Sequence, residues 1–241
     1  MPEDWLTNHE AADLLGVTAG RVNAMARSGN LAHRMAGRTR LIDPASVQRL
    51  LTTNWRRPGR PLAPSSAWAA LLSDLGTAGW SELTRALGMS PQQRYKLKRL
   101  IARSPAGNWD GLAKARAVVH RVRVRPAYLG EILQWDGVVP SGVSATARHG
   151  LDLIAAEQAE AYLGDHTRRL LEKEFHLVSS PSGNLVLRLP SVTEPHLCVV
   201  LDREVMPAAV VAVDLLDSGD PRSRRTALQI ITRLLEATLR D

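Results

Sequence analysis

Apolar residues recur at helical spacing near the start of the chain and predict two short helices joined by a tight turn. Thr7 is followed three residues later by Glu10, and each side chain can accept a free backbone N–H at a helix start, so we expect a helix from Asn8. Its apolar face consists of Ala11, Ala12, Leu14 and Leu15. Thr18 begins a second helix only three residues after Leu15. Two helices joined in this way form a helix-turn-helix unit.

The residues that follow predict a wing and a third helix. Residues 31–35 and 40–42 are expected as short strands around the turn 36–39, with Arg38 and Arg40 on or beside its tip. Asp43 and Pro44 predict the next helix start, because Asp accepts backbone N–H groups there and Pro lacks a donor where none is needed.

This segment resembles the winged helix-turn-helix of the MerR and excisionase type over about residues 7–51. The resemblance lies in Ala11-Ala12-Asp13-Leu14-Leu15-Gly16-Val17-Thr18 and in Leu41-Ile42-Asp43-Pro44-Ala45-Ser46-Val47. It implies that the second helix enters the major groove of double-stranded DNA while the wing contacts the neighbouring backbone or minor groove. The exposed positions of the second helix, carried over from the family, are Thr18, Arg21, Asn23 and Arg27.

The chemistry of these side chains agrees with DNA contact. Arginine can donate two parallel hydrogen bonds to guanine, and asparagine can pair with the edge of adenine. Thr18 can hold a phosphate at the helix N-terminus, and Arg38 and Arg40 can grip phosphates from the wing. The small residues Gly20 and Ala24 leave a thin base-reading surface, and the alternative is a module of this type that binds protein.

Residues 55–65 form a basic, proline-rich linker after this domain of residues 1–54. Arg57 and Arg60 lie in the segment Arg-Arg-Pro-Gly-Arg-Pro, which resembles the AT-hook that enters the minor groove. A plain proline-rich spacer is the alternative interpretation.

Residues 66–126 predict a basic helical domain. Helices are expected over residues 66–75 and 80–87, and a third begins at Ser90 and Pro91 and runs to about Arg103. We assign Lys96 and Lys98 on this third helix to DNA binding. Its basic face either lies along phosphates or covers an acidic surface of the chain's own second half.

Residues 127–241 predict a mixed α+β domain. Helices are expected over residues 128–134, 165–175, 207–216 and 222–239. Residues 175–189 alternate around a turn at 180–184 and predict a β-hairpin, which a third strand at 196–201 joins. The predicted fold is therefore mainly α, with a winged helix-turn-helix, a helical middle and an α+β C-terminal part.

This second half resembles the C-terminal part of AbiEi-type antitoxins. The residues responsible are Ser141-Gly142-Val143-Ser144-Ala145, His149-Gly150-Leu151, Asn184-Leu185-Val186-Leu187-Arg188, Val213-Asp214-Leu215-Leu216, Asp220, Arg222 and Arg225. The resemblance implies a transcriptional autorepressor that also neutralises a nucleotidyltransferase toxin by binding it.

Charge is segregated along the 241 residues, whose net charge is +7. Residues 1–61 carry +4, residues 62–126 carry +8 and residues 127–241 carry −5. We expect the first half to meet a polyanion and the second half to meet a basic protein. The acids behind the second expectation include Glu157, Glu160, Glu172 and Glu174, for which a solvated acidic face is the alternative.

No catalytic or metal-binding pattern appears, so we expect neither an enzyme nor a cofactor. The single cysteine, Cys198, excludes disulfides within the chain and four-cysteine zinc sites, and its apolar surroundings predict a buried, inert thiol. Asp214, Asp217 and Asp220 suggest a metal cluster, but turn chemistry is the favoured interpretation.

The sequence therefore predicts a cytoplasmic, DNA-binding transcriptional regulator that represses its own operon by occupying operator DNA. No apolar run is long enough to span a membrane. The partners expected are the DNA operator, a second copy of the chain in a homodimer, and a cognate toxin. The alternatives are an AbiEi-type antitoxin that acts by protein binding and a ligand-sensing regulator with a pocket after Pro126.

Overall fold

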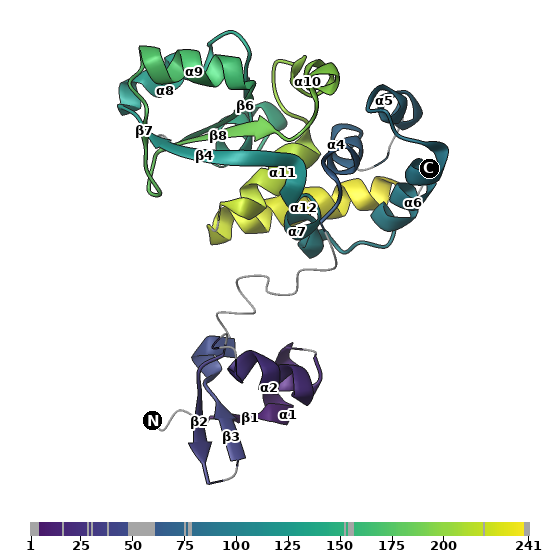
Figure 1. The fold of residues 1–241 in the computed structure, drawn as a ribbon, viewed down its shortest axis with the longest axis vertical. Helices are drawn as coiled ribbons and strands as arrows, with labels where there is room; N and C mark the ends of the chain where they lie inside the picture. The colour runs from purple at the N-terminus through teal and green to yellow at the C-terminus, as the bar shows by residue number, and fades with distance from the viewer. Residues whose placement is uncertain are drawn as a thin grey trace. The chain divides into compact units, whose positions relative to one another are not determined.

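The computed structural model divides the chain into two compact units, residues 1–57 and 58–241 (Figure 1). The structure describes residues 5–15, 17–27, 29, 31–37, 39–47, 61–74, 76, 79–151, 153, 157–218 and 220–238. The predictions for Arg38, Arg57 and Arg60 lie outside these residues.

The N-terminal unit has the predicted winged helix-turn-helix arrangement. Its elements are β1 (Leu6–Thr7), α1 (Asn8–Leu15), α2 (Ala19–Arg27), β2 (His33–Ala36) and β3 (Thr39–Ile42), and residues 44–47 are helical. The strands form an antiparallel sheet in the order β1-β3-β2, in which β2 and β3 make the wing.

Local hydrogen bonds explain where the helices of this unit begin. The Thr7 hydroxyl accepts the Glu10 backbone N–H at 3.2 Å, and the Glu10 carboxylate accepts the Thr7 backbone N–H at 2.7 Å, which confirms the predicted capping box. The Asp43 carboxylate accepts the N–H groups of Ala45 and Ser46, both at 3.0 Å. The prediction that Leu14 belongs to the apolar face of α1 was wrong, because its side chain lies beside the buried residues of this helix and is 55% exposed.

The C-terminal unit contains a five-stranded sheet and nine helices among its described residues. The strands are β4 (Ala117–Arg123), β5 (Val138–Pro140), β6 (Ala159–Leu163), β7 (Val178–Ser179) and β8 (Leu185–Pro190). The α-helices are α4 (Pro64–Leu72), α5 (Trp80–Ala86), α6 (Pro91–Ile101), α7 (Trp109–Leu112), α8 (Leu129–Leu133), α9 (Asp165–Glu174), α10 (Glu194–Leu201), α11 (Ala208–Asp217) and α12 (Pro221–Thr238). Short 3-10 turns cover Ala106–Asn108, Lys114–Arg116, Pro126–Tyr128, Gly142–Ala145 and Ala147–His149.

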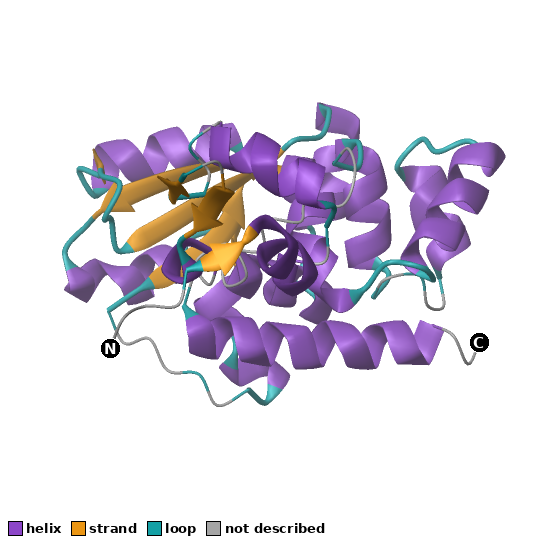
Figure 2. Ribbon diagram, turned by 90° about the horizontal axis from the view of Figure 1, so that it is seen from below, coloured by secondary structure: helices purple, strands orange, loops and turns teal. Residues whose placement is uncertain are grey.

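The sheet is a central layer with helices on both faces (Figures 1 and 2). Its strand order is β5-β6-β8-β4-β7, and only β6 and β8 run parallel among these pairs. Leu129 of α8 and Leu171 of α9 pack with Ala161 and Leu187 on one face. The other face meets the buried helix α11.

Alternation along the strands decides which side chains meet α11. Ala159, Ala161 and Leu163 of β6 belong to the apolar cluster under α8 and α9. Because successive side chains of a strand point to opposite faces, Glu160 and Tyr162 point to the side of α11. The sheet thereby carries polar groups into the interior next to that helix.

Residues 66–126 do not form a separate domain, although we predicted a boundary at residue 126. Trp68 of α4 and Trp109 of α7 are fully buried in the same apolar cluster as Val210 of α11 and Ile231 of α12. Strand β4, which lies before the predicted boundary, pairs with β8 over six residues. Pairing between distant segments therefore joins the predicted middle and C-terminal domains.

Two predicted β elements were wrong. Strands β7 and β8 do not pair as a hairpin, because β4 lies between them and is antiparallel to both. Residues 194–201 form helix α10 instead of a strand. Pro195 in the first turn favours a helix start, since its missing N–H would have no partner there.

Candidate nucleic-acid interface and the buried polar cluster

Helix α2 buries one side and exposes the other. Val22, Met25 and Ala26 pack into the core of the N-terminal unit, whereas Arg21 and Arg27 are exposed. The Thr18 hydroxyl accepts the Arg21 backbone N–H at 3.3 Å and so caps the helix. The predicted residues Thr18, Arg21 and Arg27 are therefore available on the surface of this helix, and their contacts with DNA stay predictions.

Asn23 and Arg40, which we predicted as separate DNA contacts, bind each other. The Arg40 guanidinium donates to the Asn23 side-chain oxygen at 2.7 Å, and the Asn8 amide donates to the same oxygen at 3.2 Å. Both Asn23 and Arg40 are half-buried. This contact ties the wing strand β3 to α2 and fixes the side chain of Asn23.

The wing holds a further cation that the sequence analysis did not select. The Arg34 guanidinium of β2 lies 4.4 Å from the centre of the Trp5 ring, a cation–π distance. Arg34 is exposed, so the stack orients its charge on the outside of the wing. The signal in the sequence is an aromatic residue just before the first helix together with an arginine in a predicted wing strand.

Comparison with known families supports this geometry. Residues 5–54 match the family model of a helix-turn-helix domain. The N-terminal unit is a helix-turn-helix domain. No curated protein and no solved structure matches the chain. The helix-turn-helix domain favours a DNA-binding regulator, whereas the AbiEi resemblance of the second half receives no support from these comparisons.

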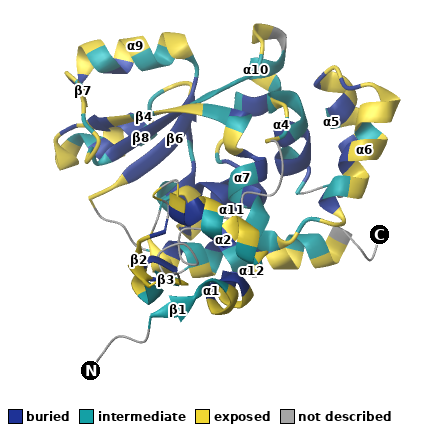
Figure 3. Ribbon diagram, turned by 60° about the horizontal axis from the view of Figure 1, so that its bottom comes forward, coloured by how far each residue is buried: buried dark blue, intermediate teal, exposed yellow. Residues whose placement is uncertain are grey.

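Helix α6 carries a basic, largely exposed surface in the C-terminal unit (Figure 3). The Ser90 hydroxyl accepts the Gln93 backbone N–H at 3.2 Å, and the Gln93 side chain accepts the Ser90 N–H at 2.7 Å, so the predicted helix start is confirmed. We call the exposed cations of this helix and of the turn that follows it the α6 basic face; they are Lys96, Lys98, Arg99 and Arg103. Tyr95 beside them is 64% exposed, and the Arg99 guanidinium lies 5.7 Å from its ring centre.

Within the described residues, the α6 basic face is not paired with acids of the chain's own second half. None of the ion pairs among the described residues involves a member of this face. A groove of about 480 Å³ runs along it, lined by Tyr95, Lys96 and Arg99 among others. The α6 basic face is therefore exposed and available to a partner, and its contact with phosphates stays a prediction.

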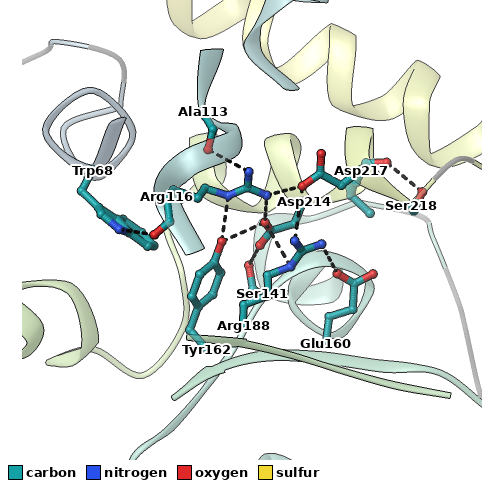
Figure 4. Close-up of polar contacts among 11 residues, drawn as sticks. Trp68, Ala113, Arg116, Ser141, Glu160, Tyr162, Arg188, Asp214, Asp217 and Ser218 are labelled. Carbon is teal, nitrogen blue, oxygen red and sulfur yellow. Dashed lines mark hydrogen bonds and ion pairs between the residues drawn. The ribbon is translucent and has the colours of Figure 1, made fainter. Parts of the chain in front are cut away.

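A buried polar cluster lies between the sheet and α11, and the sequence analysis missed it (Figure 4). Asp214 is fully buried and accepts hydrogen bonds from Arg116 at 2.5 Å and from the Tyr162 hydroxyl at 2.9 Å through one oxygen. Its other oxygen accepts from the Ser141 hydroxyl at 2.5 Å. The Arg188 Nε atom lies 3.3 Å from the first oxygen.

Two further carboxylates complete the cluster. The Arg116 guanidinium reaches Asp217 at 2.5 Å, and the Arg188 guanidinium reaches Glu160 at 3.1 Å. Both arginine side chains are only 2% exposed. Asp217, at 31% exposed, connects the cluster to solvent.

The ionisation of these groups follows from burial and from each other's charge. Burial alone would lower the pKa of Arg116, but Tyr162, Asp214 and Asp217 outweigh it and raise that pKa well above its ordinary value. Burial raises the pKa of Glu160, and the positive charge of Arg188 only partly offsets this. Burial also raises the pKa of Tyr162, so its phenol stays protonated and donates to Asp214.

The cluster explains several sequence motifs as structural. Gly142, with φ +50°, leaves room for Glu160, because a Cβ there would lie 2.5 Å from a carboxylate oxygen. The predicted turn role of the aspartates holds only for Asp220, whose carboxylate accepts the Ser223 N–H at 2.7 Å. The sequence signal that could have found Asp214 is one acid inside an otherwise apolar helix.

No metal site replaces this interpretation in the part of the chain that the structure describes. No group of three or more His, Cys, Asp or Glu residues there is placed to hold an ion. Cys198 was predicted to be buried, but it lies on α10 and is exposed. None of the described helices is long and apolar enough to cross a membrane.

The acidic surface expected in the second half is smaller than the sequence suggests. Glu160 is buried against Arg188, which corrects its assignment to an exposed face. Glu172 pairs with Arg168 at 2.5 Å on α9. Internal pairing therefore removes two of the carboxylates that motivated a basic protein partner.

Proposed function

We propose that the chain is a cytoplasmic transcriptional regulator that binds operator DNA in a sequence-dependent manner and represses its own operon by occupying that site. The observation that supports this best is the exposed face of α2 in a winged helix-turn-helix domain. The chemistry of that face, with two arginines and no acid on α2, suits the edges of bases and the phosphates around them.

The small residues of α2 favour a close approach to the groove. Gly20 and Ala24 are exposed, and around the helix axis they lie between Arg21 and Arg27. The helix backbone can therefore come near the base edges while the two guanidinium groups reach to either side. We assign base contacts to these two arginines. Arg40 acts as a positioning residue, because its hydrogen bond holds Asn23 at the edge of the same helix.

The α6 basic face supplies a second, sequence-independent contact in this proposal. Each of its cations is exposed and without an ion pair among the described residues, so each can neutralise a phosphate and release a counterion. The exposed ring of Tyr95 adds a surface on which a sugar or base can rest.

The first experiment measures the base-reading role of α2. The full chain selects its binding site from a random DNA library, and the same selection is repeated with Arg21→Ala and Arg27→Ala. Each variant should lose about 5- to 100-fold in affinity for the selected site and relax its sequence preference at one position. Arg148→Ala, an exposed arginine of the C-terminal unit, is the control and should bind as the parent chain does.

Unchanged site preference in both α2 variants would refute the proposed recognition helix. Repression is tested separately with a reporter under the promoter of the chain's own operon. Expression that does not rise when the gene is deleted would refute autorepression even if DNA binding holds.

The second experiment measures the α6 basic face through salt dependence. The triple variant Lys96→Ala, Lys98→Ala and Arg103→Ala should reduce the slope of log affinity against log salt by about 1 for each lost phosphate contact. The ranking of DNA sequences should stay unchanged, since phosphate contacts carry no base information. An unaltered slope would remove α6 from the DNA interface and leave α2 as the contact.

A further inference from the structure

A cleft opens in the C-terminal unit where strand β4 ends, and the proposed DNA contacts do not use it. Its volume is about 610 Å³, within the range of small-molecule sites. We call it the β4-end cleft; its lining includes Arg123, Arg125, Tyr128, Glu157, Phe175 and His176. These residues come from the end of β4, the turn into α8, the approach to β6 and the end of α9.

Hydrogen bonds hold the walls of the cleft in place. The Asn184 side chain exchanges two hydrogen bonds with the backbone of Val124, both at 3.0 Å. The Arg123 guanidinium donates to the Ser182 carbonyl at 3.1 Å and to its hydroxyl at 3.0 Å. The cleft is therefore formed before any ligand arrives, which lowers the entropic cost of binding.

The arginine charges of the cleft have no ion-pair partner among the residues that the structure describes. Arg123 and Arg125 are exposed, and no ion pair among the described residues involves either of them. His176 also lines the cleft, and its ring nitrogens can hydrogen-bond to a ligand. A single carboxylate, Glu157, opposes the arginines in the lining, so the cleft favours an anion that also has hydrogen-bond donors.

The cleft also has an aromatic surface. Tyr128 is half-buried, and its ring centre lies 5.5 Å from that of the buried Phe175. A planar ring of a ligand can stack on such a surface. The ligand class that combines an anion, hydroxyl donors and a planar ring is a nucleotide.

The backbone at His176 is left-handed where α9 ends. Its φ is +50°, a left-handed conformation at the end of α9 that glycine adopts without steric strain. This conformation ends the helix and places the residue so that its side chain lines the cleft.

We propose that the β4-end cleft binds a nucleotide. Arg123 and Arg125 bind the phosphate, Glu157 accepts hydrogen bonds from the sugar hydroxyls, and the base rests against Tyr128. The nucleotide comes either from the free pool or from a single strand of nucleic acid. This site is independent of the helix-turn-helix domain, so it goes beyond the proposed regulator function.

Calorimetric titration of the full chain tests the proposal. The probes are AMP, ATP, GMP and GTP, with adenosine and inorganic phosphate as fragments and a short single-stranded oligonucleotide as the second source. The nucleotides should bind with a 1:1 ratio, and both fragments should bind at least about tenfold more weakly than AMP. An oligonucleotide that binds far more tightly than every mononucleotide, and that loses this advantage in Arg125→Ala, would identify a strand as the source.

Variants assign the binding to this cleft. Arg125→Ala should weaken nucleotide binding by about tenfold or more, because it removes a charge-assisted hydrogen bond. Arg121→Ala is the matched control, since Arg121 is also exposed on β4 but does not line the cleft. Glu157→Gln should weaken the binding of AMP without weakening that of inorganic phosphate.

Three results would overturn the proposal. They are no saturable binding of any nucleotide, binding of phosphate as tight as that of AMP, and equal losses in the Arg125 and Arg121 variants. Because the readout is direct binding by the C-terminal unit's residues, a failure of DNA binding would not affect it.

Discussion

Replacing Asp214 with Asn should destabilise the C-terminal unit strongly. The substitution keeps the size of the side chain but removes its charge, which leaves Arg116 and Arg188 buried at 2% exposure next to a neutral amide. The amide oxygen can still accept from Arg116 and Tyr162 while the NH₂ group donates to the Ser141 hydroxyl oxygen, but a neutral oxygen binds a guanidinium group more weakly than a carboxylate does. Glu160 and the partly exposed Asp217 are then the remaining acids for two buried guanidinium groups.

The expected cost is about 3–5 kcal/mol, the range for removing one partner of a buried ion pair. For a unit of this size that corresponds to a fall in melting temperature of about 6–20 °C. The assay is urea unfolding of the full chain followed by circular dichroism and tryptophan fluorescence, with the two units treated as separate transitions. Asp202→Asn removes an exposed charge and is the control, which should change stability by less than about 0.5 kcal/mol.

A second variant separates the ion pair from other effects of the substitution. Arg116→Met alone should also destabilise, but the double variant with Asp214→Asn should lose less than the sum of the two single losses, because the pair is removed together. A loss below about 1 kcal/mol for Asp214→Asn, or strict additivity in the double variant, would refute the view that this cluster holds the unit together.

Two further changes probe the same unit. The pKa of Glu160 is raised above its ordinary value of 4.5 by burial, so the folded state binds its proton more tightly than the unfolded state does. The parent chain should therefore lose stability relative to Glu160→Gln as the pH rises from below 4.5 through the raised pKa. Unfolding of both proteins is measured against pH, and a constant difference between their free energies of unfolding would contradict this prediction. Gly183→Ala would place a Cβ 2.2 Å from the Val122 carbonyl oxygen, so we expect a loss of about 1–3 kcal/mol in thermal unfolding. Gly130→Ala, with nothing within 4 Å of the added Cβ and inside α8, should instead be neutral or stabilising, and equal effects of the two glycine changes would exclude the steric explanation.

Elements whose hydrogen bonds close locally could be predicted from the sequence. The capping boxes at Thr7 and Ser90 connect residues three positions apart, so a short window of sequence contains every group involved. The same holds for the two helices and the wing of the N-terminal unit, where apolar spacing and turn residues agree. The surface positions of Thr18, Arg21 and Arg27 came from the family resemblance of this segment, and the structure has all three exposed.

Only the tertiary structure decided the contacts that join distant segments. Arg116 meets Asp214 across 98 positions and Ser141 meets it across 73, and no local pattern states which arginine an interior acid will find. The placement of β4 between β7 and β8 is also a long-range contact. A turn signal at residues 180–184 predicts that the chain reverses, but it does not predict that another strand will lie between the two strands that the turn connects. The sequence by itself determined a helix-turn-helix domain because its interactions are short in range. The tertiary structure decided the polar interior and the β4-end cleft, because burial and charge pairing there depend on which strands and helices pack together.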